Sequence, residues 1–266
     1  MKDMLANLNP NQRKAVETIE GPLLIVAGPG SGKTRVITHR IAYLVRVCGI
    51  SPHRIAAVTF TNKAAREMQT RLTSLIGNDL RGLTVGTFHA FCAKVLRQDG
   101  EHIHVDRNFS IYDNADQVEL IKRSMAEVNV DPKQYAPRAI LSRISGAKSQ
   151  LIDVEGFALR KENYFDEIVI RVYERYERFL SQSAALDFDD LLFKTHFLFD
   201  KFPEISSKYQ NRYVHFLIDE FQDTNVAQYA IAKQLSQTYS NLCVVGDPDQ
   251  SIYSWRNADI RNILSF

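Results

Sequence analysis

The sequence is poor in cysteine and contains no long apolar run. Its three cysteines, Cys48, Cys92 and Cys243, are far apart and have neither the pairing of a disulfide scaffold nor the spacing of a metal site. The N-terminus, which begins Met-Lys-Asp, lacks the apolar core of a signal peptide, and no segment reaches the length of a membrane span. We therefore expect reduced thiols, a cytoplasmic location and no membrane partner.

Charge of one sign is not in excess either. Lysine and arginine together number 33 and aspartate and glutamate 31, which gives a formal net charge of +2. This balance excludes a protein that binds nucleic acid through its overall charge, so any such site must be local. The hydrophobic content of 45% and the length of 266 residues indicate a globular protein that is large enough for two domains.

What the sequence does contain is a glycine-rich loop between an apolar run and a stretch with helical periodicity. The loop, Ala27-Gly28-Pro29-Gly30-Ser31-Gly32-Lys33-Thr34, directly follows residues 23–26. Glycines let backbone N–H groups converge on an anion, and the helix N-terminus adds a favourable dipole. We predict a nucleotide triphosphate site in which Lys33 reaches the β- and γ-phosphates and the Thr34 hydroxyl ligates Mg²⁺. Ala27 replaces the first glycine of the strict pattern. Arg35 follows the loop and is either a further contact to the nucleotide or an ordinary arginine on the surface of the helix.

Short β-rich runs alternate with longer amphipathic segments, which is typical of a parallel sheet covered by helices. The expected strands are 23–26, 55–60, 83–87, 216–218 and 242–245. The expected helices include 62–76 and 88–96. Residues 91–211 differ, because apart from a short strand at 109–112 they have helical periodicity and long charged faces. The prediction is an α/β P-loop domain with a parallel sheet, formed by residues 1–90 and 212–266 and interrupted by a mostly helical subdomain, 91–211. Tyr173, Tyr176 and Phe179 are expected in the core of that subdomain.

Two carboxylates follow the fourth expected strand, in the run Leu217-Ile218-Asp219-Glu220. At the end of a buried strand that faces a phosphate loop, Asp219 would hold Mg²⁺, usually through water, and Glu220 would orient and deprotonate the attacking water. An Asp-Glu pair alone can equally be a turn or a cap. Its combination with the glycine-rich loop favours the catalytic interpretation.

A third polar segment follows the last expected strand and runs from Gly246 to Arg256. Gln250 is placed there to sense a γ-phosphate. Tyr253 and Trp255 alternate, so on an extended backbone they would face the same way and offer a platform for stacked bases, with Arg256 beside them. The alternative is that the two aromatic residues only cover the surface of the domain.

Together these segments resemble superfamily 1 DNA helicases of the UvrD/Rep/PcrA type, over essentially the whole chain. The run Leu8-Asn9-Pro10-Asn11-Gln12 is similar to the adenine-reading Q motif of that family, which implies that Gln12 bonds the base. Residues 59–65 resemble motif Ia, in which the Phe60 position packs against single-stranded DNA, and residues 86–89 resemble motif Ib, which lines the DNA path. The resemblance implies DNA-binding roles for Phe60, Thr61, Asn62, His89, Tyr253, Trp255 and Arg256. His89 taken alone would be an ordinary core or capping histidine.

The resemblance further implies that the α/β domain is RecA-like and uses ATP and Mg²⁺. The activity implied is that of an ATP-dependent DNA helicase, with 3′→5′ polarity, which translocates on single-stranded DNA and acts at single-strand/double-strand junctions in repair or replication. The family's motifs IV, V and VI, on a second RecA-like half, have no match in this sequence. We therefore expect the N-terminal half of a longer polypeptide, weakly active by itself.

Three other functions stay open. A GTPase would need an Asn-Lys-x-Asp guanine reader, but Asn62-Lys63 is followed by two alanines and Gln12 favours adenine. The chain could also be the helicase portion of a RecB- or AddA-like helicase-nuclease, or a catalytically silent module that binds ATP and single-stranded DNA.

Overall fold

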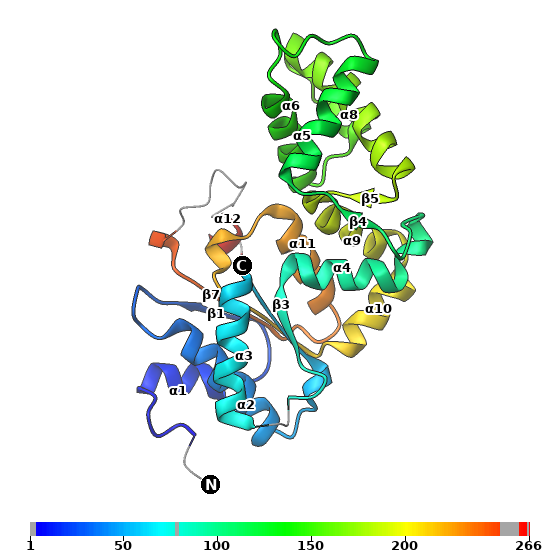
Figure 1. The fold of residues 1–266 in the computed structure, drawn as a ribbon. Helices are drawn as coiled ribbons and strands as arrows, with labels where there is room; N and C mark the ends of the chain where they lie inside the picture. The colour runs from blue at the N-terminus through cyan, green and yellow to red at the C-terminus, as the bar shows by residue number, and fades with distance from the viewer. Residues whose placement is uncertain (1–3, 78–79, 251–260, 265) are drawn as a thin grey trace. The chain divides into compact units, whose positions relative to one another are not determined.

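The computed structural model describes residues 4–77, 80–250, 261–264 and 266, and the chain forms two compact units (Figure 1). One unit consists of residues 1–91 and 199–266, and the other of residues 92–198. The first contains a five-stranded parallel sheet and the second is mainly helical, which confirms the predicted fold class. Within the described residues, no helix is both long enough and apolar enough to span a bilayer.

The sheet of the first unit has the strand order β1-β7-β6-β2-β3, and all neighbouring strands are parallel. Val26 pairs with Gly246, while Val58 pairs with both Ile218 and Gly86, so all five strands end along one edge. The segments that follow the strands therefore begin at the same edge, where ligands of open α/β sheets bind. The strands are β1 (Leu23–Val26), β2 (Ile55–Thr59), β3 (Thr84–Thr87), β6 (His215–Ile218) and β7 (Leu242–Gly246).

Helices cover both faces of this sheet. Leu217 and Cys243 belong to a buried cluster with the apolar residues of α2 and α3. On the other face, the ring of Phe216 contacts Phe88 and Phe91 of α4, and α11 packs on β6 and β7. Burial on both faces explains why the central strands β2, β6 and β7 are mainly apolar, whereas the edge strands β1 and β3 are only partly buried. The helices are α1 (Pro10–Glu17), α2 (Lys33–Arg46), α3 (Asn62–Ile76), α10 (Pro203–Arg212), α11 (Val226–Ser236) and α12 (Arg261–Leu264), with α4 (Phe88–Asp99) and α9 (Phe188–Lys201) each shared with the second unit.

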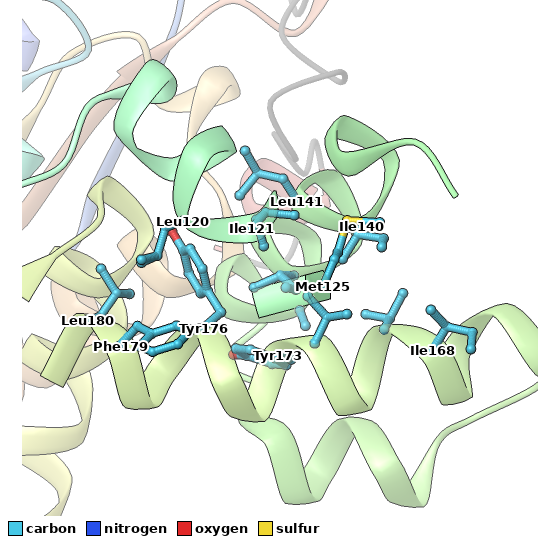
Figure 2. Packing of buried hydrophobic residues seen from close by; sticks show 14 of the residues in the cluster. Leu120, Ile121, Met125, Ile140, Leu141, Ile168, Tyr173, Tyr176, Phe179 and Leu180 are labelled. Atoms are coloured by element: carbon cyan, nitrogen blue, oxygen red, sulfur yellow. The ribbon is translucent and has the colours of Figure 1, made fainter. Parts of the chain in front are cut away.

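The second unit packs its helices around an apolar core of its own (Figure 2). Tyr173, Tyr176 and Phe179 of α8 are buried in it, as the sequence predicts. A two-stranded parallel sheet pairs β4 with β5. The sequence analysis expected a strand at 109–112, which includes β4, but none at the position of β5. The elements are α5 (Asn114–Glu127), α6 (Pro137–Ser149), α7 (Val154–Leu159), α8 (Tyr164–Gln182), β4 (Ser110–Ile111) and β5 (Ala185–Leu186).

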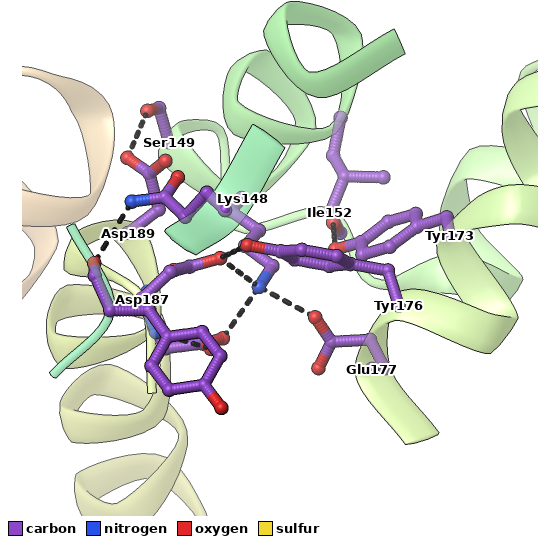
Figure 3. A network of polar contacts seen from close by, with 11 residues as sticks. Lys148, Ser149, Ile152, Tyr173, Tyr176, Glu177, Asp187 and Asp189 are labelled. Atoms are coloured by element: carbon purple, nitrogen blue, oxygen red, sulfur yellow. Dashed lines mark hydrogen bonds and ion pairs between the residues drawn. The ribbon is translucent and has the colours of Figure 1, made fainter. Parts of the chain in front are cut away.

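A buried ion cluster lies beside that core (Figure 3). Lys148 is 1% exposed, and its Nζ lies 2.5 Å from Glu177 Oε1 and 2.8 Å from one oxygen each of Asp187 and Asp190. Tyr176 donates its hydroxyl to Asp187 at 3.0 Å. Burial alone would lower the pKa of Lys148, but the three carboxylates outweigh it and raise that pKa well above its ordinary value.

The second boundary between the units lies within α9, at residues 198/199, whereas the sequence analysis expected it at 211/212. Residues 199–212 join the first unit through a chain of aromatic contacts. Phe199 lies 5.5 Å from Tyr209, Tyr209 lies 6.5 Å from Tyr213, and Tyr213 lies 5.6 Å from Phe91, between ring centroids. Periodicity identifies α10 as helical, but it does not tell which core a helix joins.

Candidate functional site

The loop at residues 27–32 joins β1 to α2 at the carboxyl edge of the sheet. Gly30 and Gly32 have φ angles of +69° and +86°, a left-handed conformation that side chains disfavour. At Gly32 a Cβ would also lie 3.1 Å from Gln12 Nε2. Residues 28–31 are exposed to solvent, so the backbone of the loop is open to a ligand.

Gln12 is fixed against this loop by both ends of its amide. Its Oε1 accepts from the backbone N–H of Asn9 at 3.1 Å, which completes a capping box at the start of α1. Its Nε2 donates to the carbonyl oxygen of Ser31 at 2.9 Å. The Q-motif residue therefore connects α1 to the glycine-rich loop.

Lys33 and Gln250 both point to one carboxylate oxygen. Lys33 Nζ lies 3.3 Å from Asp247 Oδ2 and donates to the Ala27 carbonyl at 3.1 Å, while Gln250 Nε2 donates to the same Asp247 Oδ2 at 2.6 Å. Asp247 is 2% exposed. The two side chains that the sequence assigns to the γ-phosphate thus meet at a single buried oxygen atom.

Thr34 and Asp219 form the second pair of the site. The Thr34 hydroxyl donates to Asp219 Oδ2 at 3.3 Å, across the gap between α2 and the end of β6. Burial, with a smaller contribution from the charge of Glu220, raises the pKa of Asp219 to about 6. A hydroxyl beside a buried carboxylate is a suitable donor set for Mg²⁺, which takes one or two protein oxygens together with water and phosphate oxygens. Among the described residues, no group of three or more His, Cys, Asp or Glu side chains could hold a metal.

Glu220 follows Asp219 in a left-handed conformation, with φ at +54°. Its Oε2 accepts from Gln222 Nε2 at 2.8 Å, and the Oε1 of that same glutamine accepts from the backbone N–H of Asp247 at 3.0 Å. Burial, and then the charge of Glu220, raise the pKa of Asp223 to about 6. The loop after β6 is therefore rich in negative charge and hydrogen-bonded to the end of β7.

Four of the residues assigned to DNA by resemblance follow β2 and β3; β2 pairs with β6, which precedes Asp219, and β3 is the edge strand next to β2. Phe60 and His89 are partly buried. Thr61 is the N-cap of α3, because its hydroxyl accepts from the Ala64 N–H at 3.1 Å, and Asn62 is the exposed first residue of that helix. Arg35 is exposed in the first turn of α2. Tyr253, Trp255 and Arg256 lie outside the described residues.

Sequence reasoning missed Asp247 and Gln222 as participants. Asp247 had a signal, since it follows a buried strand just as Asp219 does. Gln222 had none, because the spacing of a glutamine in a short loop does not tell which neighbours its amide reaches.

Comparison with known proteins gives a consistent result. A family model described as the UvrD/REP helicase N-terminal domain matches residues 8–266. The chain is 51% identical, over 263 residues, to the ATP-dependent DNA helicase PcrA of Bacillus subtilis (strain 168), a match that covers 99% of this chain and 36% of that protein. It is 48% identical, over 266 residues, to proteins of the same name from Staphylococcus epidermidis and Staphylococcus aureus, again covering 36% of each. The chain thus spans about a third of the length of these curated relatives. By these matches, the chain belongs to the UvrD/REP helicase family and corresponds to its N-terminal domain.

Proposed function

We propose that this chain is the N-terminal, ATP-binding part of an ATP-dependent DNA helicase. The observation that carries the proposal is the meeting of three strand ends, where Lys33 and Asp247 lie 3.3 Å apart and Thr34 and Asp219 also lie 3.3 Å apart. The 3′→5′ polarity, the role in repair or replication and the preference for single-strand/double-strand junctions rest on the family resemblance. A cytoplasmic location is in keeping with three free thiols.

In the proposed site the loop at 27–34 grips the phosphates of ATP, and Gln12 reads the adenine edge, because one amide can donate and accept at once. Lys33 leaves Asp247 for the phosphate oxygens. Thr34 and Asp219 would hold Mg²⁺, which neutralises charge on the phosphate oxygens when bound. Arg35 is exposed in the same turn of α2 and would contact the nucleotide from outside.

Glu220 acts as the general base. Its carboxylate accepts the proton of the attacking water. Gln250 contacts the γ-phosphate and couples its presence to the proposed DNA-contacting residues Tyr253, Trp255 and Arg256. A second RecA-like half of the same polypeptide would supply the far wall of the cleft and the arginines that stabilise the transition state.

Single-stranded DNA is the proposed partner at the ends of β2 and β3. Phe60 would pack on a base, and Thr61, Asn62 and His89 would line the path of the strand. Tyr253, Trp255 and Arg256 complete this proposed surface as a stacking platform with a cation beside it.

The experiment measures nucleotide affinity and steady-state ATPase in the complete polypeptide that carries this domain. Lys33→Ala should weaken ATP binding, because it removes a charge paired with phosphate. Glu220→Gln keeps the shape of the site and should bind ATP but lose on the order of 10²–10⁴-fold in turnover. Lys122→Ala, on an exposed helix face, is the control and should change neither. Undiminished turnover in Glu220→Gln would overturn the assignment of the base.

A further inference from the structure

The amide of Gln222 lies between the proposed general base and the end of β7, and the function proposed above does not use it. Gln222 is 1% exposed. Its Nε2 donates to Glu220 Oε2 at 2.8 Å, and its Oε1 accepts from the Asp247 N–H at 3.0 Å. Nε2 also lies 3.4 Å from Asp223 Oδ2. The amide is therefore oriented, with its donor end on the carboxylates and its acceptor end on the neighbouring strand.

The carboxylate of Glu220 needs such a contact to keep one direction. Glu220 has left-handed backbone angles, φ +54° and ψ +47°, which are sparsely populated for a residue with a side chain. Its side chain is only partly buried, so packing alone does not hold it. A charge-assisted hydrogen bond from a buried, immobilised amide fixes the oxygen that would receive the proton.

Gly246 leaves the space that this arrangement needs. A Cβ at position 246 would lie 2.9 Å from Gln222 Oε1 and 3.3 Å from the Gln222 backbone nitrogen. The first distance is too short for any real contact, so a larger residue would displace the amide. The glycine at the end of β7 and the glutamine after β6 therefore fit each other.

The acceptor end of the amide connects the base to the phosphate side of the site. The backbone N–H of Asp247 donates to Gln222 Oε1. The side chain of the same residue accepts, at Oδ2, from Lys33 Nζ and Gln250 Nε2. One amide therefore connects the backbone at Asp247 to the Glu220 carboxylate.

We propose that Gln222 is a positioning residue for hydrolysis: it directs the Glu220 carboxylate and couples its direction to the backbone at Asp247. This inference rests on the proposed role of Glu220 as the general base. Misplacement of a reacting group by about 1 Å can cost roughly 10²-fold in rate, so the effect of losing the amide should appear in kcat.

The test measures kcat, KM for ATP and thermal unfolding in the complete polypeptide. Gln222→Met keeps the volume and removes the hydrogen bonds of the amide, while Gln222→Glu keeps the acceptor for Asp247 and replaces the donor to Glu220. Both should lower kcat about 10- to 100-fold and leave KM within about threefold. Gln228→Met is the matched control, because Gln228 is a buried glutamine of the neighbouring helix cap, 4% exposed, that bonds Asn225 instead of Glu220. It should keep kcat within about twofold of the wild type while losing comparable thermal stability.

A double-mutant comparison separates positioning from a general structural effect. In the Glu220→Gln background, Gln222→Met should change the residual single-turnover rate less than about twofold, because residues that act as a unit are not additive. Equal losses in both backgrounds, or a rise in KM with unchanged kcat, would overturn the inference. Should Gln222→Met not fold, Gly246→Ala takes its place. It should lower kcat in the wild-type background and leave the residual rate of Glu220→Gln unchanged. An unchanged kcat in the wild-type background would refute the positioning role. If Glu220→Gln itself turns over normally, the proposed base fails instead.

Discussion

Replacing Lys148 by methionine should destabilise the helical unit far more than the same change at an exposed lysine. Lys148 Nζ lies within 2.8 Å of Glu177, Asp187 and Asp190, and the side chain is 1% exposed. Methionine keeps most of the apolar stem but leaves the three carboxylates without this cation. Breaking a buried ion pair by removing one partner costs about 3–5 kcal/mol, out of a total of about 5–15 kcal/mol for a typical domain.

The cost should depend on pH, with a sign that follows from the carboxylates. Burial first, and then the neighbouring charge of Asp190, already raise the pKa of Asp187, and burial raises that of Glu177. Without Lys148 these pKa values rise further. An acid whose pKa is raised by folding contributes stability at low pH that is lost as the pH rises through the folded-state pKa. The deficit of Lys148→Met should therefore be largest near pH 8 and shrink toward pH 5.

Urea unfolding followed by far-UV circular dichroism at pH 5, 6.5 and 8 measures the loss of unfolding free energy. Amide hydrogen exchange in peptides from 140–150 and 185–195 shows which part of the chain is destabilised. Lys161→Met is the control, since Lys161 makes an exposed ion pair with Glu167 at 3.0 Å and such pairs contribute about 0–1 kcal/mol. Equal costs for the two variants, or a cost for Lys148→Met that ignores pH, would refute the electrostatic account.

Four further predictions follow from the sheet edge. Gln12→Ala should narrow the difference between ATP and GTP affinity in nucleotide competition, and a wild type with no adenine preference would contradict the role of Gln12. Trp255 is the single tryptophan, so its fluorescence should be quenched by single-stranded DNA, with each stacked base worth about 1–3 kcal/mol; a signal indifferent to saturating DNA would count against the platform. The pKa of Asp219 is raised to about 6, so ionisation of this carboxyl lowers the stability of the folded chain above that pH. Asp219→Asn should therefore be more stable than the wild type at pH 8, by up to about 3 kcal/mol. Thermal unfolding without nucleotide measures this difference, which should vanish below pH 4. The chain 1–266 alone should hydrolyse ATP barely and without stimulation by DNA, because arginines from a second half would contribute about 10³–10⁵-fold; stimulated turnover near that of the complete polypeptide would contradict this.

The sequence was most informative where chemistry and periodicity coincide. Each of the five strands of the main sheet was predicted to within one residue at either end. The central strands β2, β6 and β7 are buried throughout and mainly apolar, and glycine or acidic residues follow β1, β6 and β7 closely. The pair Thr34 and Asp219 could be anticipated for the same reason, since both follow recognisable strands. Strand order could not, because nothing in an isolated run such as β6 states that it inserts between β7 and β2. Asp247 and Gln222 depend on that order, and their contacts appear only once β6 and β7 are placed side by side.

The order of the strands also determines when this chain can bind a nucleotide during its synthesis. β1 is an edge strand whose neighbour is β7, and the backbone N–H of Ala27 donates to the carbonyl of Gly246 at 3.2 Å. Gly246 is made 219 residues after Ala27, which at ~5–20 residues per second is a delay of about 11–44 s. During that time residues 92–198 of the helical unit are translated, while β1 lacks the strand that pairs with it. The first residue of the loop, Ala27, then lacks its hydrogen-bond acceptor, the Gly246 carbonyl. The glycine-rich loop is thus among the first parts of the chain to be translated and among the last to acquire its working shape.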